Sequence, residues 1–223
     1  MLCRIATPVV VCLHGLGRSS ADWDGVRPAL QRRGPVVTPE LPRDVDRAER
    51  IAAAATPAGA ILVGHTLGAV IAMRLAAVSG TGIRGVVLSS SFFPPALNGR
   101  SLPATVGDYA RHRLAFVRGL RGADRPTGSG RGTVRGLGFL VRTATRAPAF
   151  RSTTEAITSD VLVLHAADDH YVPLDFALAA VARRPAWEIK VLDRGGHYPQ
   201  VSYPTDWLDV VVPWLERHAP DPQ

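Results

Sequence analysis

The segment from Ile61 to Ala72 constrains the fold more than any other part of the chain. A short apolar run, Ile61–Val63, leads into residues 64–68, which read Gly-His-Thr-Leu-Gly, and an Ala-rich stretch of helical character follows. Glycines have no Cβ, so a strand and the next helix can cross closely where two glycines flank a turn. The segment therefore predicts a sharp strand-to-helix turn that exposes Thr66 above a sheet.

Apolar, β-branched runs alternate with helical patterns along most of the chain. The runs predict strands over Val9–Leu13, Val36–Thr38, Ala60–Val63, Val86–Ser89, Val161–His165 and Trp187–Leu192. The helical patterns cover Ser19–Gln31, Asp44–Ala55, the stretch from the turn to Val78, Leu174–Arg183 and Pro204–His218. Such alternation is typical of a parallel sheet built from right-handed crossovers. We expect an α/β fold with a mostly parallel sheet of about six strands and helices on both faces.

Residues 92–159 interrupt this alternation. The segment has no clear strand pattern and is rich in Gly, Pro and Arg. It is interpreted as a small cap inserted over the sheet, with helical pieces around Val106–Leu120 and Val134–Thr145. The chain of 223 residues is then a single domain, with residues 1–91 and 160–223 forming the core and 92–159 the cap.

The net charge of +7 is concentrated in the predicted cap. Between Ala96 and Arg151 the sequence holds eleven arginines and two aspartates. One interpretation is a solvated basic face, and the other is electrostatic steering of an anionic or carrier-linked substrate. Nucleic acid is not expected as a partner, because no aromatic stacking pattern or known nucleic-acid motif accompanies the arginines.

The chain contains two cysteines and no long apolar run. No stretch approaches the ~20 residues that span a bilayer. The N-terminal residues pass almost directly into a strand pattern, which is not typical of a signal peptide. Cys12 lies within an apolar strand, and reduced thiols are expected for both Cys3 and Cys12. The expected location is cytoplasmic.

Candidate partners for Thr66 follow the last two predicted strands. Asp168 and Asp169 come after the fifth strand, and His197 follows two glycines after the sixth. The carboxyl ends of parallel strands share one edge of a sheet, where α/β proteins place their chemistry. The order of hydroxyl, carboxylate and histidine along the chain is that of an α/β-hydrolase catalytic triad.

These motifs make the chain resemble the α/β-hydrolase family over almost its whole length. Four stretches match the family's motifs in order: His14–Gly17, Gly64–Gly68 with threonine in place of serine, Asp169–Pro173, and Gly196–His197. The resemblance implies an α/β-hydrolase fold without its first hairpin. It also implies an enzyme that needs no cofactor.

The resemblance further implies a role for each candidate residue. Thr66 would stand at the nucleophile position, and His197 would be the general base and then the general acid. Asp169 would orient His197. The backbone N–H groups of Leu16 and Leu67 would form the oxyanion hole.

Several polar residues compete with these assignments. Asp168 is an alternative acid, but Asp169 has the family's spacing to Val172 and Pro173. His14 and His65 are interpreted as structural residues of the two glycine turns. No cluster of His, Cys and Asp has the spacing of a metal site, and the glycine turns do not match a phosphate-binding loop.

Threonine at the centre of the turn leaves three functions open. A β-branched residue is disfavoured at positive φ, and its methyl group restricts χ1 and crowds the attacking oxygen. The first hypothesis is a hydrolase that cleaves an ester or thioester of a small acyl substrate through Thr66. The second is a lyase or cyclase that reuses His197 and the oxyanion hole, and the third is a binding protein with a silenced site. The sequence leaves the substrate and the oligomeric state open.

Overall fold

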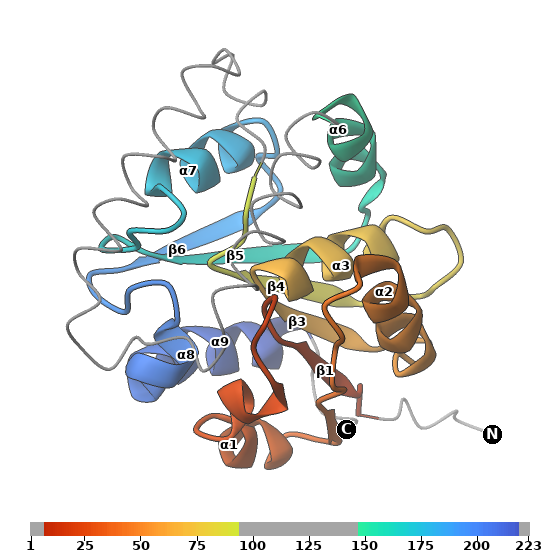
Figure 1. The fold of residues 1–223 in the computed structure, drawn as a ribbon, viewed down its shortest axis with the longest axis horizontal. Coiled ribbons are helices and arrows are strands. Elements are labelled where there is room, and N and C mark those ends of the chain that lie inside the picture. The colour runs from red at the N-terminus through yellow and green to blue at the C-terminus, as the bar shows by residue number, and fades with distance from the viewer. Residues whose placement is uncertain (1–6, 94–146, 219–223) are drawn as a thin grey trace.

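A computed structural model describes residues 7–93 and 147–218 of the chain (Figure 1). These residues form a six-stranded sheet in the order β2-β1-β3-β4-β5-β6, and every neighbouring pair is parallel. The strands are β1 (Val10–Leu13), β2 (Val36–Val37), β3 (Ile61–His65), β4 (Gly85–Ser89), β5 (Asp160–Ala166) and β6 (Glu188–Leu192). The predicted α/β fold with a parallel sheet is confirmed.

Helices cover both faces of the sheet. They are the 3-10 helix η1 (Ser20–Trp23), α1 (Arg27–Gln31), α2 (Val45–Ala54), α3 (Leu67–Ala76), α6 (Ala147–Ala156), α7 (Leu174–Ala182), α8 (Pro199–Ser202) and α9 (Pro204–His218). Helices α2, α3, α6 and α7 lie on one face, and η1, α1, α8 and α9 lie on the other (Figure 1). The sheet is therefore the middle layer of three.

The strands are apolar on both sides because each face has its own core. Val11 and Leu13 of β1 pack into the core beneath α3 and α7, whereas Val10 and Cys12 pack into the core beneath α1 and α9. Successive side chains of a strand point to opposite faces, so a strand buried between two helical layers must be continuously apolar. This is why the apolar runs located the strands.

The helix predicted over Ser19–Gln31 is wrong as a single element. The structure has the short η1, a turn, and then α1, which begins at Arg27. Gly25 is a poor helix former, and Pro28 fits only the first turn of a helix, where no N–H bond is lost. The two residues therefore end one helical piece and begin another.

The predicted cap falls mostly on residues 94–146, outside the described part of the chain. The two helical pieces predicted there, and the division into core and cap, stay predictions. Within the predicted cap range the structure describes α6, which packs against α3. Among the described helices, none has the length and apolar character needed to cross a membrane.

Candidate active site

Thr66 lies at the tip of a strained turn between β3 and α3. Its backbone has φ 51° and ψ −104°, a conformation that is costly for a β-branched residue. The two flanking glycines make the turn possible. A Cβ on Gly64 would lie 2.5 Å from the Cα of Ala69, and one on Gly68 would overlap the carbonyl group of Leu13. The glycines thus allow the close crossing that the sequence predicted, and this crossing exposes part of Thr66.

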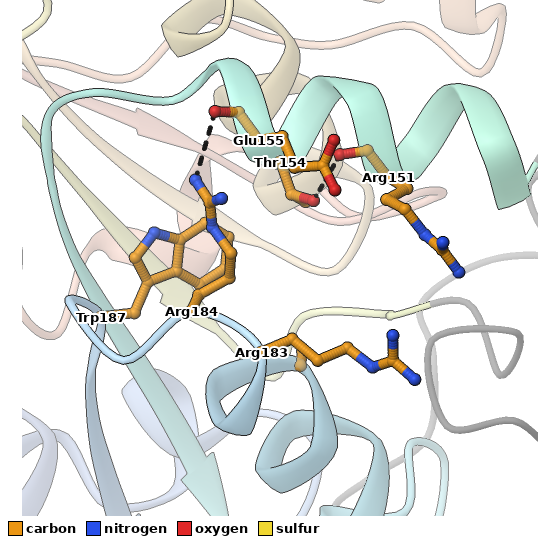
Figure 2. Close-up of a pocket in the computed structure, with 7 residues that line it drawn as sticks. Arg151, Thr154, Glu155, Arg183, Arg184 and Trp187 are labelled. Carbon is orange, nitrogen blue, oxygen red and sulfur yellow. Dashed lines mark hydrogen bonds between the residues drawn. The ribbon is translucent and has the colours of Figure 1, made fainter.

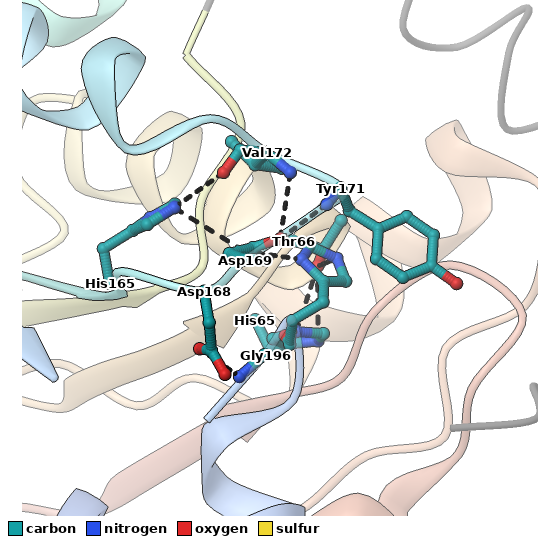
Figure 3. A network of polar contacts seen from close by, with 9 residues as sticks. His65, Thr66, His165, Asp168, Asp169, Tyr171, Val172 and Gly196 are labelled. Atoms are coloured by element: carbon teal, nitrogen blue, oxygen red, sulfur yellow. Dashed lines mark hydrogen bonds and ion pairs between the residues drawn. The ribbon is translucent and has the colours of Figure 1, made fainter. Parts of the chain in front are cut away.

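Two hydrogen bonds connect Thr66, His197 and Asp169 (Figure 3). The carboxylate Oδ2 of Asp169 accepts from Nδ1 of His197 at 2.9 Å. Since a carboxylate only accepts, a neutral His197 carries its proton on Nδ1 and leaves Nε2 free to accept. The hydroxyl of Thr66 lies 2.9 Å from that Nε2 and donates to it. The structure therefore brings together the three side chains selected from the sequence, in the protonation pattern that activates a hydroxyl.

The carboxylate of Asp169 is buried, and both of its oxygens accept hydrogen bonds. Its Oδ1 accepts from the backbone N–H groups of Tyr171 and Val172 at 2.8 and 3.0 Å. Burial alone would raise the pKa of Asp169, but the interactions with His197 and the backbone N–H of Val172 lower it overall. His165, for which the sequence suggests no partner, lies 3.6 Å from Oδ2 and bonds the carbonyl oxygen of Val172. Asp169 is thus held as an anion behind His197.

Asp168, the alternative acid, makes a different contact. Its Oδ1 accepts from the backbone N–H of Gly196 at 2.8 Å. Gly195 and Gly196 both have positive φ, which lets the chain turn sharply just before His197. One carboxylate therefore contacts the imidazole of His197, and its neighbour holds the backbone turn that carries that imidazole.

A second histidine lies against the hydroxyl of Thr66. Ring nitrogens Nε2 and Nδ1 of His65 are 3.1 and 3.3 Å from Oγ1. His65 donates from Nε2 to the carbonyl oxygen of His197 at 2.7 Å, so its neutral form carries the proton on Nε2. Burial, and to a smaller extent His197, lower the pKa of His65 to about 3. His65 therefore stays neutral at physiological pH, and in the described part of the chain its Nε2 bonds a backbone carbonyl oxygen and not a carboxylate.

The two predicted oxyanion donors belong to backbone segments that adjoin Thr66. Leu67 is the first residue of α3, and an N–H in the first turn of a helix has no acceptor within the helix. Leu16 follows Gly15, where a Cβ would lie 2.9 Å from Nδ1 of His65 and 3.5 Å from the Cβ of Thr66. The loop that carries Leu16 therefore passes close to the side chain of Thr66.

His14 anchors this same loop and has a structural environment. Its Nε2 accepts from the backbone N–H of Leu41 at 2.8 Å, and its Nδ1 donates to the carbonyl oxygen of Gly15 at 2.9 Å. The imidazole thus joins the loop after β1 to the chain beyond β2.

Aromatic rings lie around His197, a feature that the motifs in the sequence did not predict. The ring centroids of Tyr171 and Tyr198 lie 4.6 and 5.0 Å from that of His197. The guanidinium of Arg18 lies 4.6 Å from the centroid of Tyr198, and Arg18 also pairs with the buried Asp22. A tyrosine two residues after Asp169 and another directly after His197 were the available signal. These rings pack against the imidazole.

No metal-binding group emerges among the described residues. Within them, no three His, Cys, Asp or Glu side chains are close enough to hold a metal ion. Cys12 is a free thiol in the core, and burial raises its pKa to about 12, so it is not a ready thiolate ligand. Cys3 lies outside the described residues.

The buried histidines predict a loss of stability in acid. His65 and His165 have folded-state pKa values below their usual 6.5, because burial penalises the charged ring. The unfolded chain therefore binds more protons below pH 6.5, and the free energy of unfolding falls as the pH is lowered. The slope is about 1.4 kcal/mol per pH unit for each ring that is protonated only on unfolding. The lowered pKa of Asp169 acts in the same direction below its usual 3.8.

Urea denaturation at several pH values between about 6.5 and 4.5 measures this slope. His65→Gln removes one of the titrating rings while it keeps an N–H donor for the carbonyl oxygen of His197. The variant should have a shallower slope than the wild type. An unchanged slope would show that His65 is not held neutral in the folded state.

The sequence of the chain is also similar to known proteins. The family model described as "Alpha/beta hydrolase family" matches residues 10–210, which is most of the chain. A relative from Neisseria meningitidis named pimeloyl-[acyl-carrier protein] methyl ester esterase is 26% identical, and the match covers 89% of this chain and 73% of the relative.

Solved structures show the same fold at low sequence identity. A structure of AqDC, described with the recognition and ring-cleavage of the Pseudomonas quinolone signal, has a TM-score of 0.69 at 17% identity and covers 94% of this chain and 92% of its own. A structure from work on carboxylesterases of Nitrososphaera gargenis has a TM-score of 0.68 at 15% identity, with coverages of 95% and 90%. At these identities the likeness shows the fold alone.

Proposed function

The chain belongs to the alpha/beta hydrolase family, and from this premise we propose that it hydrolyses an ester or thioester through an acyl-enzyme on Thr66. The observation that carries the proposal is the hydrogen-bonded series from Thr66 Oγ1 through His197 to Asp169, with 2.9 Å at each step. A nucleophile, a base and an orienting carboxylate in this relation are the elements of covalent acyl transfer.

The first half of the proposed reaction forms the acyl-enzyme. His197 Nε2 takes the proton of Thr66 while Oγ1 attacks the carbonyl carbon of the substrate. The carbonyl oxygen becomes an oxyanion, which the N–H groups of Leu16 and Leu67 stabilise. His197 then gives its proton to the leaving alcohol or thiol as that bond breaks. The acyl group remains as an ester on Thr66.

The second half returns the enzyme to its starting state. Water replaces the leaving group and loses a proton to His197 Nε2 as its oxygen attacks the acyl carbon. The bond from Thr66 Oγ1 to the acyl carbon breaks, and His197 returns the proton to Oγ1. Asp169 stabilises the positive charge on the imidazole in both halves without itself taking a proton.

The proposed substrate is a small acyl ester or thioester, including one joined to an acyl carrier. The name of the Neisseria relative, a methyl ester esterase of an acyl-carrier-linked substrate, supports this class. As part of the same proposal the protein works in the cytoplasm. The low cysteine content and the free, buried thiol of Cys12 support that location.

Substitution of Thr66 tests the proposal. Thr66→Ser keeps the hydroxyl, removes the methyl group and lowers the cost of the positive φ, so we expect kcat to rise by about tenfold. Thr66→Ala removes the nucleophile and should lower kcat by about 10³-fold or more. Hydrolysis of p-nitrophenyl acetate, butyrate and octanoate by the three proteins gives kcat and KM.

Mass spectrometry of the intact protein provides the control for mechanism. Brief incubation with substrate should add one acyl group to the wild type and none to Thr66→Ala. Turnover without an adduct that is equal in the wild type and in Thr66→Ala would contradict covalent hydrolysis. It would favour direct attack of water on the ester, with His197 taking the proton of that water.

A further inference from the structure

A basic pocket lies between α6 and α7, separate from the candidate active site (Figure 2). Its volume is about 290 Å³, and its lining consists of Arg151, Thr154, Glu155, Ala180, Arg183, Arg184 and Trp187. For comparison, one water molecule occupies about 30 Å³ in the liquid. The pocket is therefore large enough for a small organic anion.

The chain direction places this pocket away from Thr66. Thr66, Asp169 and His197 follow the carboxyl ends of β3, β5 and β6. Helix α7 runs back from the carboxyl end of β5 to the amino end of β6, so its last turn lies at the amino edge of the sheet. Arg183 and Arg184 follow that last turn, and Trp187 directly precedes β6. The pocket and the hydroxyl are thus at opposite edges of the sheet.

Arg184 has a structural role within the pocket. Its guanidinium donates to the carbonyl oxygens of Glu155 and Ile157 at 3.4 Å, which joins α7 to the end of α6. It also lies 5.6 Å from the ring centroid of Trp187, which is buried. This arginine is therefore fixed in place, with its charge kept beside the pocket.

Arg151 and Arg183 carry charges with no partner among the described residues. They come from different helical segments, are exposed, and extend in the same direction from the pocket (Figure 2). Among the described residues of the lining, Glu155 is the single carboxylate. Three guanidinium groups against one carboxylate leave a formal charge of +2. Like charges gathered around one hollow repel each other unless an anion lies between them.

We propose that this pocket binds the phosphate group of a small phosphorylated molecule. A phosphate monoester carries about −1.5 to −2 charge at neutral pH, which matches the charge of the lining, whereas a monocarboxylate carries half of it. The planar guanidinium of arginine donates two parallel hydrogen bonds to phosphate oxygens. Arg151 and Arg183 would hold the phosphate from opposite sides, and Thr154 and Glu155 would face the rest of the molecule. The proposal does not depend on ester hydrolysis at Thr66.

Isothermal titration calorimetry in a low-salt buffer without phosphate tests the site. The probes are orthophosphate, glycerol 3-phosphate and acetate. We expect the two phosphates to bind with dissociation constants of about 1 mM or lower, and acetate to bind at least about tenfold more weakly. Equal binding of orthophosphate and glycerol 3-phosphate would assign recognition to the phosphate group alone. Tighter binding of glycerol 3-phosphate would show that the rest of the lining also contacts the ligand.

Four single variants locate the binding within the molecule. Arg151→Gln and Arg183→Gln should each weaken the binding of glycerol 3-phosphate by about tenfold. Glu155→Gln should strengthen that binding by about twofold. Arg50→Gln on α2 is the matched control, because Arg50 is also exposed but lies outside the pocket. Ester hydrolysis should be unchanged in all four. The absence of saturable binding, or an equal loss in Arg50→Gln, would overturn the proposal.

Discussion

Asp169→Asn should lower kcat for ester hydrolysis by about 10³- to 10⁴-fold. The asparagine amide can present an N–H to His197 Nδ1, which then has to accept. The ring would carry its proton on Nε2, where the hydroxyl of Thr66 needs an acceptor 2.9 Å away. The variant also loses the negative charge that stabilises the protonated imidazole. KM should change little, because Asp169 is buried behind His197.

Asp168→Asn is the matched control for this experiment. It makes the same chemical change one residue earlier, and its remaining side-chain oxygen can still accept from the N–H of Gly196. Its kcat should stay within about tenfold of the wild type. If Asp168→Asn proved as damaging as Asp169→Asn, the assignment of Asp169 as the orienting acid would be wrong. Steady-state kinetics on one p-nitrophenyl ester are sufficient for the comparison.

Gly68→Ala should have the largest effect on stability. The added Cβ would overlap backbone atoms of Leu13 and would lie 2.9 Å from the carbonyl oxygen of His14. These are atoms of β1 and of the loop after it, and they cannot move without separating α3 from the sheet. We expect a loss of about 4 kcal/mol or more, a large share of the usual stability of a domain. Urea denaturation, or the absence of folded protein on expression, measures it.

Gly25→Ala provides the contrast. Its Cβ would meet the Cβ of Pro204 at 3.7 Å, an ordinary van der Waals distance. We expect a change within about 1 kcal/mol, and the sign can be stabilising because alanine restricts the unfolded chain. If Gly68→Ala were as stable as Gly25→Ala, the close crossing of α3 over β1 would not be required for folding.

Local patterns were sufficient to predict a parallel sheet and the positions of its strands along the chain. The β-branched runs located β1, β3, β4 and β5, because strands between two helical layers must be apolar on both sides. The spacing of Gly64 and Gly68 indicated the turn at Thr66 for a similar reason, since a Cβ at either position would collide with the backbone. In both cases a local physical requirement restricts which residue types can occupy the position, and the sequence shows that restriction directly.

Contacts between distant segments could not be predicted in the same way. The sequence selected Thr66, Asp169 and His197 by motif, but it did not indicate that His65 bonds the backbone of His197 across 132 positions. Nor did it show that Asp168 holds Gly196, since both carboxylates occupy the same loop. Helix α8 was not predicted, because a single turn that begins at Pro199 is too short to show a helical pattern. The catalytic roles themselves stay predictions until the variants are measured.

The pair of adjacent carboxylates on the β5–α7 loop has a mechanical consequence. Asp169 is bonded to the imidazole of His197, and Asp168 is bonded to the backbone at Gly196, so the two loops are joined at two points. Two attachments oppose rotation as well as separation, so the carboxylate of Asp169 and the imidazole of His197 tend to move together. The hydrogen bond from His65 to the carbonyl oxygen of His197 in turn limits how far these two loops can move from Thr66. Alignment of the three groups is thus achieved during folding, before any substrate arrives.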